Sequence, residues 1–170
     1  MTAYLESGMD FSPLFNHSDY ESFYIEKSAD YDCLKTSGVK SVEFLSKRKD
    51  TLCFIEAKTT FANLNKAENL EKIQSDFQEL YDKFCHSFLL FVSKELKISS
   101  TSTDFSFLNR SILETHKLKF YLVIKESKEE WCDDIKLKLE REIFMPLRKL
   151  LNLEVRVING ETARKFKIIT

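Results

Sequence analysis

Three ionisable residues near the ends of two adjacent apolar segments could act together in chemistry. Glu56 and Lys58 lie two residues apart in the segment TLCFIEAK, and Glu43 lies in the apolar segment before it. In an extended strand, residues two apart point to the same face, so Glu56 and Lys58 share one face of a sheet. If the chain turns near Lys49 or Asp50, Glu43 faces this region from the neighbouring strand. We therefore expect two carboxylates and one ammonium group to converge on one patch of sheet.

Such a patch is suited to phosphodiester hydrolysis. Two carboxylate oxygens and a backbone carbonyl, here that of Ala57, can hold Mg²⁺ or Mn²⁺ and leave positions for water and a phosphate oxygen. The metal polarises the phosphate and lowers the pKa of the bound water. A lysine beside the metal can orient the water or stabilise the charge that develops on the phosphate. The candidate metal ligands are therefore Glu43, Glu56 and Ala57, and the candidate catalytic residues are Glu43, Glu56 and Lys58.

The bare acid-x-Lys pattern is not specific, because it occurs at three other places in the chain. Two of the other matches fall in predicted helices, where residues two apart do not share a face. The third follows a predicted strand but has no acidic strand before it at hairpin distance. Only Glu56 and Lys58 follow apolar strand residues, have an acidic partner one hairpin back and precede a long helix. The other three matches are Glu95/Lys97, Glu126/Lys128 and Asp134/Lys136.

The segment SVEFLSKRKDTLCFIEAK, with the helix after it, resembles the core of the PD-(D/E)XK nuclease superfamily over residues 39–96. Members of this superfamily place an acid on one strand, an acid-x-Lys at the end of the next strand, and a helix thereafter. The resemblance puts Glu43 at the first acid, Glu56 at the second and Lys58 at the lysine. It implies a restriction-endonuclease-like α/β fold, in which a mixed β-sheet with an αβββαβ-type core is flanked by helices.

The acids of this chain depart from the family pattern in two respects. The first acid of the family is usually Asp, and Glu43 is longer by one methylene. Many members also supply a glutamate from an upstream helix, a role for which Glu21 and Glu26 are available here. Neither has a motif around it, so the sequence leaves the choice between them open.

The elements that would position these residues follow from a change in the period of the apolar side chains. They alternate with a period of two in the predicted strands and recur at three- and four-residue steps in the predicted helices. We expect Pro146 to kink or restart the second helix. The order of strands and helices implies a mixed sheet flanked by helices. The predicted strands are residues 39–46, 51–58, 118–125 and 153–158, with a polar hairpin tip at 46–50, and the predicted helices are residues 67–96 and 128–151.

Two further segments have weaker patterns. Phe23 and Ile25 alternate with polar neighbours, which predicts one more strand or a short helix before the hairpin. Residues 97–106 are rich in Ser and Thr and predict a loop. The apolar residues between positions 105 and 113 predict a short helical piece after this loop.

The composition fits one domain that spans residues 1–170. Hydrophobic residues make up 43% of the chain, enough for one core, and 3 Gly and 2 Pro leave little material for a linker. The first 15 residues show no basic stretch followed by an apolar one, and the sequence has no run of about 18 apolar residues, so we expect a cytoplasmic protein without a membrane span. The 4 cysteines and 3 histidines have no zinc-ligand spacing, which argues against a zinc site.

The formal net charge of −1 argues against a protein that coats nucleic acid through bulk attraction. It permits an enzyme that contacts phosphates through one local patch and a metal. The sequence therefore predicts a Mg²⁺- or Mn²⁺-dependent nuclease, with nucleic acid as its partner and DNA as the expected substrate. A chain of 170 residues has little room for a separate DNA-reading domain, so we expect dimerisation or a partner protein as the source of specificity.

Two alternatives stand beside this hypothesis. The chain could be a catalytically inactive member of the same fold that binds nucleic acid or protein, which the near-neutral charge favours. The intact set of Glu43, Glu56 and Lys58 favours the enzyme, because a degenerate site should have lost one of the three. The second alternative is a cross-strand ion-pair cluster on the solvated face of a sheet, worth under about 1 kcal/mol per pair.

Overall fold

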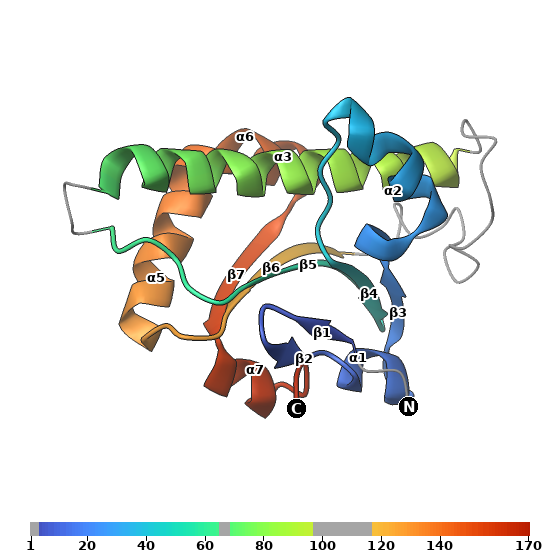
Figure 1. Cartoon of the computed structure of the whole chain (residues 1–170), viewed down its shortest axis with the longest axis horizontal. Coiled ribbons are helices and arrows are strands. Elements are labelled where there is room, and N and C mark those ends of the chain that lie inside the picture. The colour runs from blue at the N-terminus through green and yellow to red at the C-terminus, as the bar shows by residue number, and fades with distance from the viewer. Residues whose placement is uncertain (1–3, 65–68, 97–116) are drawn as a thin grey trace.

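Five strands of the described residues form one mixed sheet, in the order β3, β4, β5, β6, β7 (Figure 1). The computed structural model describes residues 4–64, 69–96 and 117–170. Strands β3, β4 and β5 pair antiparallel, whereas β5, β6 and β7 pair parallel and are connected through helices. The α/β class with a mixed sheet is therefore confirmed. The strands are β3 (Glu21–Tyr24), β4 (Phe44–Arg48), β5 (Thr51–Lys58), β6 (Lys117–Ile124) and β7 (Glu154–Asn159).

The hairpin that carries the candidate residues joins β4 to β5 through a turn at Lys49 and Asp50. The turn lies where the sequence predicts it. Residues 47 and 48, predicted as part of the polar tip, instead belong to β4, whereas residues 39–43, predicted as the start of this strand, precede it. The neighbouring strand explains this difference, because Lys47 pairs with Glu21 of β3 both in the ladder and through an ion pair of 3.3 Å. A third strand thus holds the polar end of β4 in the sheet.

Helix α3 (Leu70–Glu95) lies across one face of the sheet (Figure 1). Its apolar side chains recur at helical spacing and pack on the aromatic rings of Phe54 in β5 and Phe120 in β6. The helix matches the predicted span of 67–96, of which residues 67 and 68 lie outside the described part of the chain. The fully buried apolar side chains of this helix include Ile73, Phe77, Leu80, Phe84 and Phe91.

The helix predicted over residues 128–151 is divided into two parts. α5 (Glu129–Lys138) runs into a π-helical turn (Leu139–Ile143), after which α6 (Met145–Leu151) begins. Pro146 lies in the first turn of α6, where its missing N–H would have had no partner within the helix. The predicted interruption at Pro146 is confirmed, in the form of a restart.

Segments from both ends of the chain cover the other face of the sheet (Figure 1). β1 (Leu5–Glu6) and β2 (Met9–Asp10) form a small hairpin, and the short helices α1 (Pro13–Asn16) and α7 (Gly160–Lys165) lie on the same side. These segments bury a second apolar cluster against the sheet. The sequence does not predict this layer, because elements of two to six residues are too short to show a period.

Between β3 and β4 the chain forms three short helical elements. They are η1 (Ile25–Lys27), α2 (Ala29–Leu34) and η2 (Lys35–Ser37). The sequence leaves a strand or a short helix open before the hairpin, and the structure has both. The N–H of Ile25 donates to the Glu43 carbonyl at 2.9 Å, which fixes η1 beside the start of β4.

Two predictions concern segments away from the sheet. The short helical piece predicted between residues 105 and 113 lies outside the described residues. None of the described helices, including the 26-residue α3, combines the length and the apolarity that a membrane span requires.

Candidate functional site

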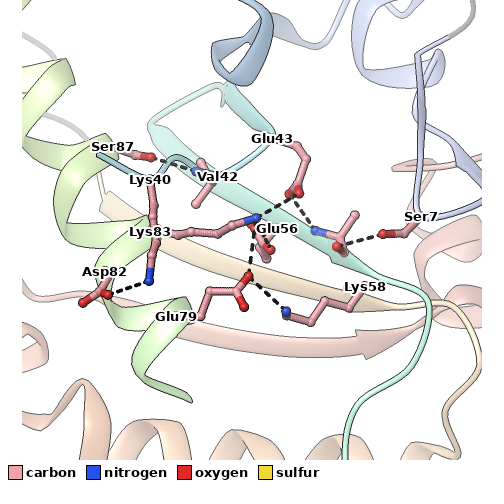
Figure 2. A network of polar contacts seen from close by, with 11 residues as sticks. Ser7, Lys40, Val42, Glu43, Glu56, Lys58, Glu79, Asp82, Lys83 and Ser87 are labelled. Carbon is pink, nitrogen blue, oxygen red and sulfur yellow. Dashed lines mark hydrogen bonds and ion pairs between the residues drawn. The ribbon is translucent and has the colours of Figure 1, made fainter. Parts of the chain in front are cut away.

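Glu43 and Glu56, here called the carboxylate pair, lie beneath α3 on the face of the sheet that this helix covers (Figure 2). The side chain of Phe54, two residues before Glu56, packs in the cluster beneath α3, whereas that of Ile55 packs on the other face. Glu43 immediately precedes β4, and the pairing of Phe44 with Ile55 places it opposite Glu56. The structure thus brings together the two carboxylates that the sequence places on neighbouring strands.

Both members of the carboxylate pair are buried. The exposed fraction is 5% for Glu43 and 1% for Glu56. The alternative of a cluster on the solvated face of a sheet is therefore wrong for these two residues, because α3 covers that face. Burying a carboxylate is costly unless it gains strong partners, so the contacts of the pair decide what it can do.

A backbone N–H of the neighbouring strand holds the Glu43 carboxylate in place. The regular ladder between β4 and β5 ends at Phe44 and Ile55, two residues before Ala57. The Ala57 N–H donates to Glu43 Oε2 at 2.8 Å. The N–H of Val42, which would otherwise continue the ladder opposite Ala57, donates instead to Ser87 Oγ of α3 at 2.9 Å. The carboxylate therefore takes the place of a strand partner, and its position is fixed by the backbone.

Lys83 of α3 bridges the carboxylate pair (Figure 2). Its Nζ lies 2.8 Å from Glu56 Oε1 and 3.4 Å from Glu43 Oε1, and its side chain is 14% exposed. The acid-x-Lys motif does not predict this residue as part of the site. The available signal is its position on the helix, three residues after buried Leu80 and four before buried Ser87, where a charged side chain borders the apolar stripe.

Lys58 shares the face of the carboxylate pair but does not contact it directly in the structure (Figure 2). Its Nζ donates to Glu79 Oε1 at 3.2 Å, and the side chain is 18% exposed. Glu79 Oε1 also lies 3.9 Å from Lys83 Nζ. Lys58 is thus linked to the carboxylate pair only indirectly, through Glu79 and Lys83 of α3. The role of Lys58 in chemistry stays a prediction.

The carbonyl of Ala57, the third predicted metal ligand, contacts the turn between β1 and β2. Ser7 Oγ donates to this carbonyl at 3.0 Å, and Thr59 Oγ1 donates to the Ser7 carbonyl at 3.2 Å. The turn residues Ser7 and Gly8 have φ angles of 49° and 70°, the left-handed region that favours glycine. The N-terminal hairpin is therefore docked on the end of β5, where the acid-x-Lys motif lies.

Two further glutamates gather around Glu43. Oxygens of Glu6 in β1, Glu26 in η1 and Glu43 all lie within 4.8 Å of one another. Of the two upstream acids that the sequence leaves open, Glu26 therefore joins the site. Glu21 does not, because it is 53% exposed and pairs with Lys47 on the outer part of the sheet. Glu6 has no sequence signal, since it lies in a strand of two residues.

Burial, together with the charge of neighbouring acids, raises the pKa of three carboxyl groups. Burial raises the pKa of Glu56 well above its ordinary value, and the charge of Glu43 raises it further. Burial and the charge of Glu43 also raise the pKa of Glu6 and of Glu26. Burial alone would lower the pKa of Lys83, but the charges of Glu56 and Glu43 raise it above its ordinary value, so its ammonium stays protonated. Added positive charge would stabilise such a group of carboxylates.

No family model, no curated protein and no solved structure matches this chain. Membership of the PD-(D/E)XK superfamily therefore stays a prediction from the sequence.

The donor set fits a hard divalent cation. Carboxylate oxygens are the ligands that Mg²⁺ prefers in proteins. Among the described residues, Glu56 Oε2 is buried without a hydrogen-bond partner, so its lone pairs are available to a cation. The oxygens of Glu6, Glu26 and Glu43 would have to draw closer, since neighbouring ligand oxygens around Mg²⁺ are about 3 Å apart.

A pocket of about 450 Å³ lies on the opposite face of the sheet and has weaker chemistry. Its lining includes Arg48, Cys53 and Tyr121. Arg48 pairs with Asp19, and burial raises the pKa of the Cys53 thiol to about 12, so this cysteine is no nucleophile at neutral pH. The carboxylate pair is therefore the stronger candidate for a functional site.

Proposed function

We propose that this chain is a metal-dependent nuclease that hydrolyses phosphodiester bonds in DNA, and that the carboxylate pair is its metal-binding centre. The observation that carries the proposal is the placement of Glu43 and Glu56. They are 5% and 1% exposed, they meet at the end of the central hairpin, and Glu56 Oε2 has no hydrogen-bond partner among the described residues. Burying two carboxylates together is unfavourable for stability alone, which favours a functional reason for their presence.

The order of elements supports a restriction-endonuclease-like fold. Along the chain, α1, β3, β4, β5, α3 and β6 follow the αβββαβ order, with α2 inserted between β3 and β4. The acid-x-Lys motif lies at the end of the third of these strands, and α3 follows it. This placement agrees with the position that the resemblance implies for the motif.

The residues of the chain have separate roles in this proposal. Glu43 and Glu56 would hold Mg²⁺ or Mn²⁺, with Glu26 and Glu6 as further carboxylates. The bound metal supplies Lewis-acid activation of the phosphate and of a water molecule. The Ala57 N–H holds Glu43 at 2.8 Å, so this carboxylate keeps its position without the metal.

Lys58 is the candidate catalytic lysine in this proposal. It lies at the end of β5, and its side chain is 18% exposed and held by Glu79. An ammonium at this edge can orient a water molecule or stabilise negative charge on a phosphate oxygen. The contact with Glu79 restricts the rotamers of Lys58 before substrate arrives.

A second candidate function is a catalytically inactive module of the same fold that binds nucleic acid or protein. One observation favours it. The ammonium of Lys83 already pairs with both carboxylates, at 2.8 Å and 3.4 Å, and partly neutralises them without a metal. Such an ion pair could keep the fold of an ancestral nuclease after its chemistry was lost.

Cleavage assays distinguish the two functions. Plasmid DNA, single-stranded DNA and RNA would be incubated with the parent chain in Mg²⁺, Mn²⁺ or chelator. We expect metal-dependent cleavage of DNA by the parent, and a loss of several orders of magnitude in Glu56→Gln and Lys58→Ala. Glu21→Gln and Lys72→Ala, which alter exposed side chains away from the carboxylate pair, are the matched controls and should retain the parent rate.

Two results would contradict the proposal in different ways. A parent chain that cleaves no substrate under any metal condition would favour the binding module. Cleavage at the full rate by Lys58→Ala would refute the role of this lysine while leaving the metal centre intact.

A further inference from the structure

The ammonium of Lys83 lies between the two carboxylates that the proposed function assigns to the metal (Figure 2). Its Nζ contacts one oxygen of Glu56 at 2.8 Å and one of Glu43 at 3.4 Å. The side chain reaches this position from α3, which lies across the sheet, so the contact depends on the packing of the helix. An ammonium in this position is a cation bound to the centre in the absence of metal.

A divalent ion and this ammonium would repel each other if both were held by the same oxygens. Charges this close interact strongly where water is largely excluded. Lys83 is 14% exposed and Glu56 is 1% exposed, so solvent screens the repulsion poorly. Binding of a metal by the carboxylate pair is therefore in competition with Lys83.

Glu79 provides an alternative partner for the displaced ammonium. It lies four residues before Lys83 on α3, and its Oε1 is 3.9 Å from Lys83 Nζ. Glu79 is 35% exposed, so a lysine that moves towards it also gains contact with water. Rotation about the terminal bonds of a flexible lysine side chain is sufficient for this exchange, and α3 need not move.

We propose that Lys83 is the resident cation of the carboxylate pair, and that a divalent metal ion binds by displacing its ammonium towards Glu79. The inference rests on the metal-binding part of the proposed function and names what regulates it. Lys83 keeps the two carboxylates together in the absence of metal, and Glu79 sets how readily it leaves. The apparent metal affinity is then lowered by the free energy of breaking this ion pair.

Mn²⁺ titration of variants tests the exchange. Free Mn²⁺ would be measured by electron paramagnetic resonance for the parent, Lys83→Met, Glu79→Gln and the double variant. We expect Lys83→Met to bind Mn²⁺ at least about tenfold more tightly, because the competing charge is gone. Glu79→Gln should bind more weakly than the parent, and this effect should shrink in the double variant, where no ammonium has to move.

Lys94→Met is the matched control on the same helix. Lys94 pairs with Asp30 at 2.8 Å, with side chains that are 10% and 5% exposed, away from the carboxylate pair. Both lysine variants should unfold at a lower temperature than the parent in chelator. Saturating Mn²⁺ should raise the unfolding midpoint of Lys83→Met to that of the parent. The difference in midpoint between Lys94→Met and the parent should be the same in Mn²⁺ as in chelator.

Reductive methylation of the parent chain gives a second measurement that needs no variant. Lys83 should be protected from methylation in chelator and become reactive in saturating Mg²⁺, as read by mass spectrometry. This measurement decides the matter if Lys83→Met does not fold.

The inference is overturned if Lys83→Met binds Mn²⁺ no more tightly than the parent, or if Mg²⁺ leaves Lys83 protected. These results differ from a failure of the proposed function. A chain that exchanges Lys83 for metal but cleaves no substrate keeps the inference and refutes the nuclease. A parent that cleaves DNA while Lys83→Met binds metal no better keeps the nuclease and refutes the exchange.

Discussion

Replacement of Glu43 by alanine measures how much of the fold depends on the carboxylate pair. The Glu43 carboxylate accepts a hydrogen bond from the Ala57 N–H at 2.8 Å, and Glu43 is only 5% exposed. Alanine at position 43 therefore leaves this buried donor without a partner. An orphaned buried N–H costs about 1–3 kcal/mol. The one methylene that alanine lacks, Cγ, adds about 0.8 kcal/mol. Relief of repulsion among the acids returns part of this loss, and we expect Glu43→Ala to lower the free energy of unfolding by about 1–3 kcal/mol.

Two companion variants separate the contributions to this loss. Glu43→Gln keeps an oxygen for the Ala57 N–H and keeps the methylenes, so it should cost about 1 kcal/mol or less. Glu21→Ala removes the exposed ion pair with Lys47 on the same sheet and should also cost about 1 kcal/mol or less. Equilibrium unfolding in urea at pH 7, with chelator present, gives all three free energies of unfolding. The comparison holds when the dependence of the free energy on urea concentration has the same slope in the three variants.

Equal losses of stability in the three variants would contradict a structural role for the Glu43 carboxylate. A Glu43→Ala variant as stable as Glu21→Ala would mean that Glu43 is solvated and that the Ala57 N–H finds another partner. A Glu43→Gln variant as unstable as Glu43→Ala would mean that the negative charge, and not the hydrogen bond, holds this residue in place.

Two further predictions follow from pKa values. The pKa of Glu56 is raised above its ordinary 4.5, so in chelator the folded state keeps a proton that the unfolded state releases. The free energy of unfolding of the parent, taken relative to that of Glu56→Gln, should therefore fall as the pH rises from 4.5 through the folded-state pKa of Glu56. A difference between the two proteins that rises with pH would contradict this. Burial raises the pKa of Cys53 to about 12, so iodoacetamide at pH 8 should label exposed Cys33 and spare Cys53. Equal labelling of both, measured by mass spectrometry, would rule out the packing around β5.

The strand-borne half of the site can be predicted from the sequence. Residues two apart share a face of a strand, and a turn at Lys49 and Asp50 sets the register, so these two local rules are enough to place Glu43 opposite Glu56. Local rules of the same kind predict α3 and the interruption at Pro146. These features depend on neighbours in sequence, which is why a single sequence suffices for them.

The rest of the site depends on contacts between segments far apart in the chain. The spacing of apolar residues in α3 does not predict that Lys83 reaches the carboxylates, because the orientation of the helix on the sheet is a tertiary property. Glu6 lies in a two-residue strand and joins Glu43 only because the N-terminal hairpin docks on β5 through Ser7. The alternative that Glu56 lies on a solvated face of the sheet is wrong for the same reason, because α3 covers the face on which Glu56 lies.

The central claim is that a divalent metal ion binds at the carboxylate pair, and Mn²⁺-induced broadening of backbone amide signals by NMR tests it most directly. The Ala57 N–H lies 2.8 Å from Glu43 Oε2, whereas the hairpin turn at Asp50 is about 20 Å from Glu56 along β5. At substoichiometric Mn²⁺, the Ala57 signal should vanish first and the Asp50 signal should persist, and Glu43→Gln should abolish this order. Broadening that leaves the Ala57 signal intact, or that is the same in Glu43→Gln, would contradict the claim.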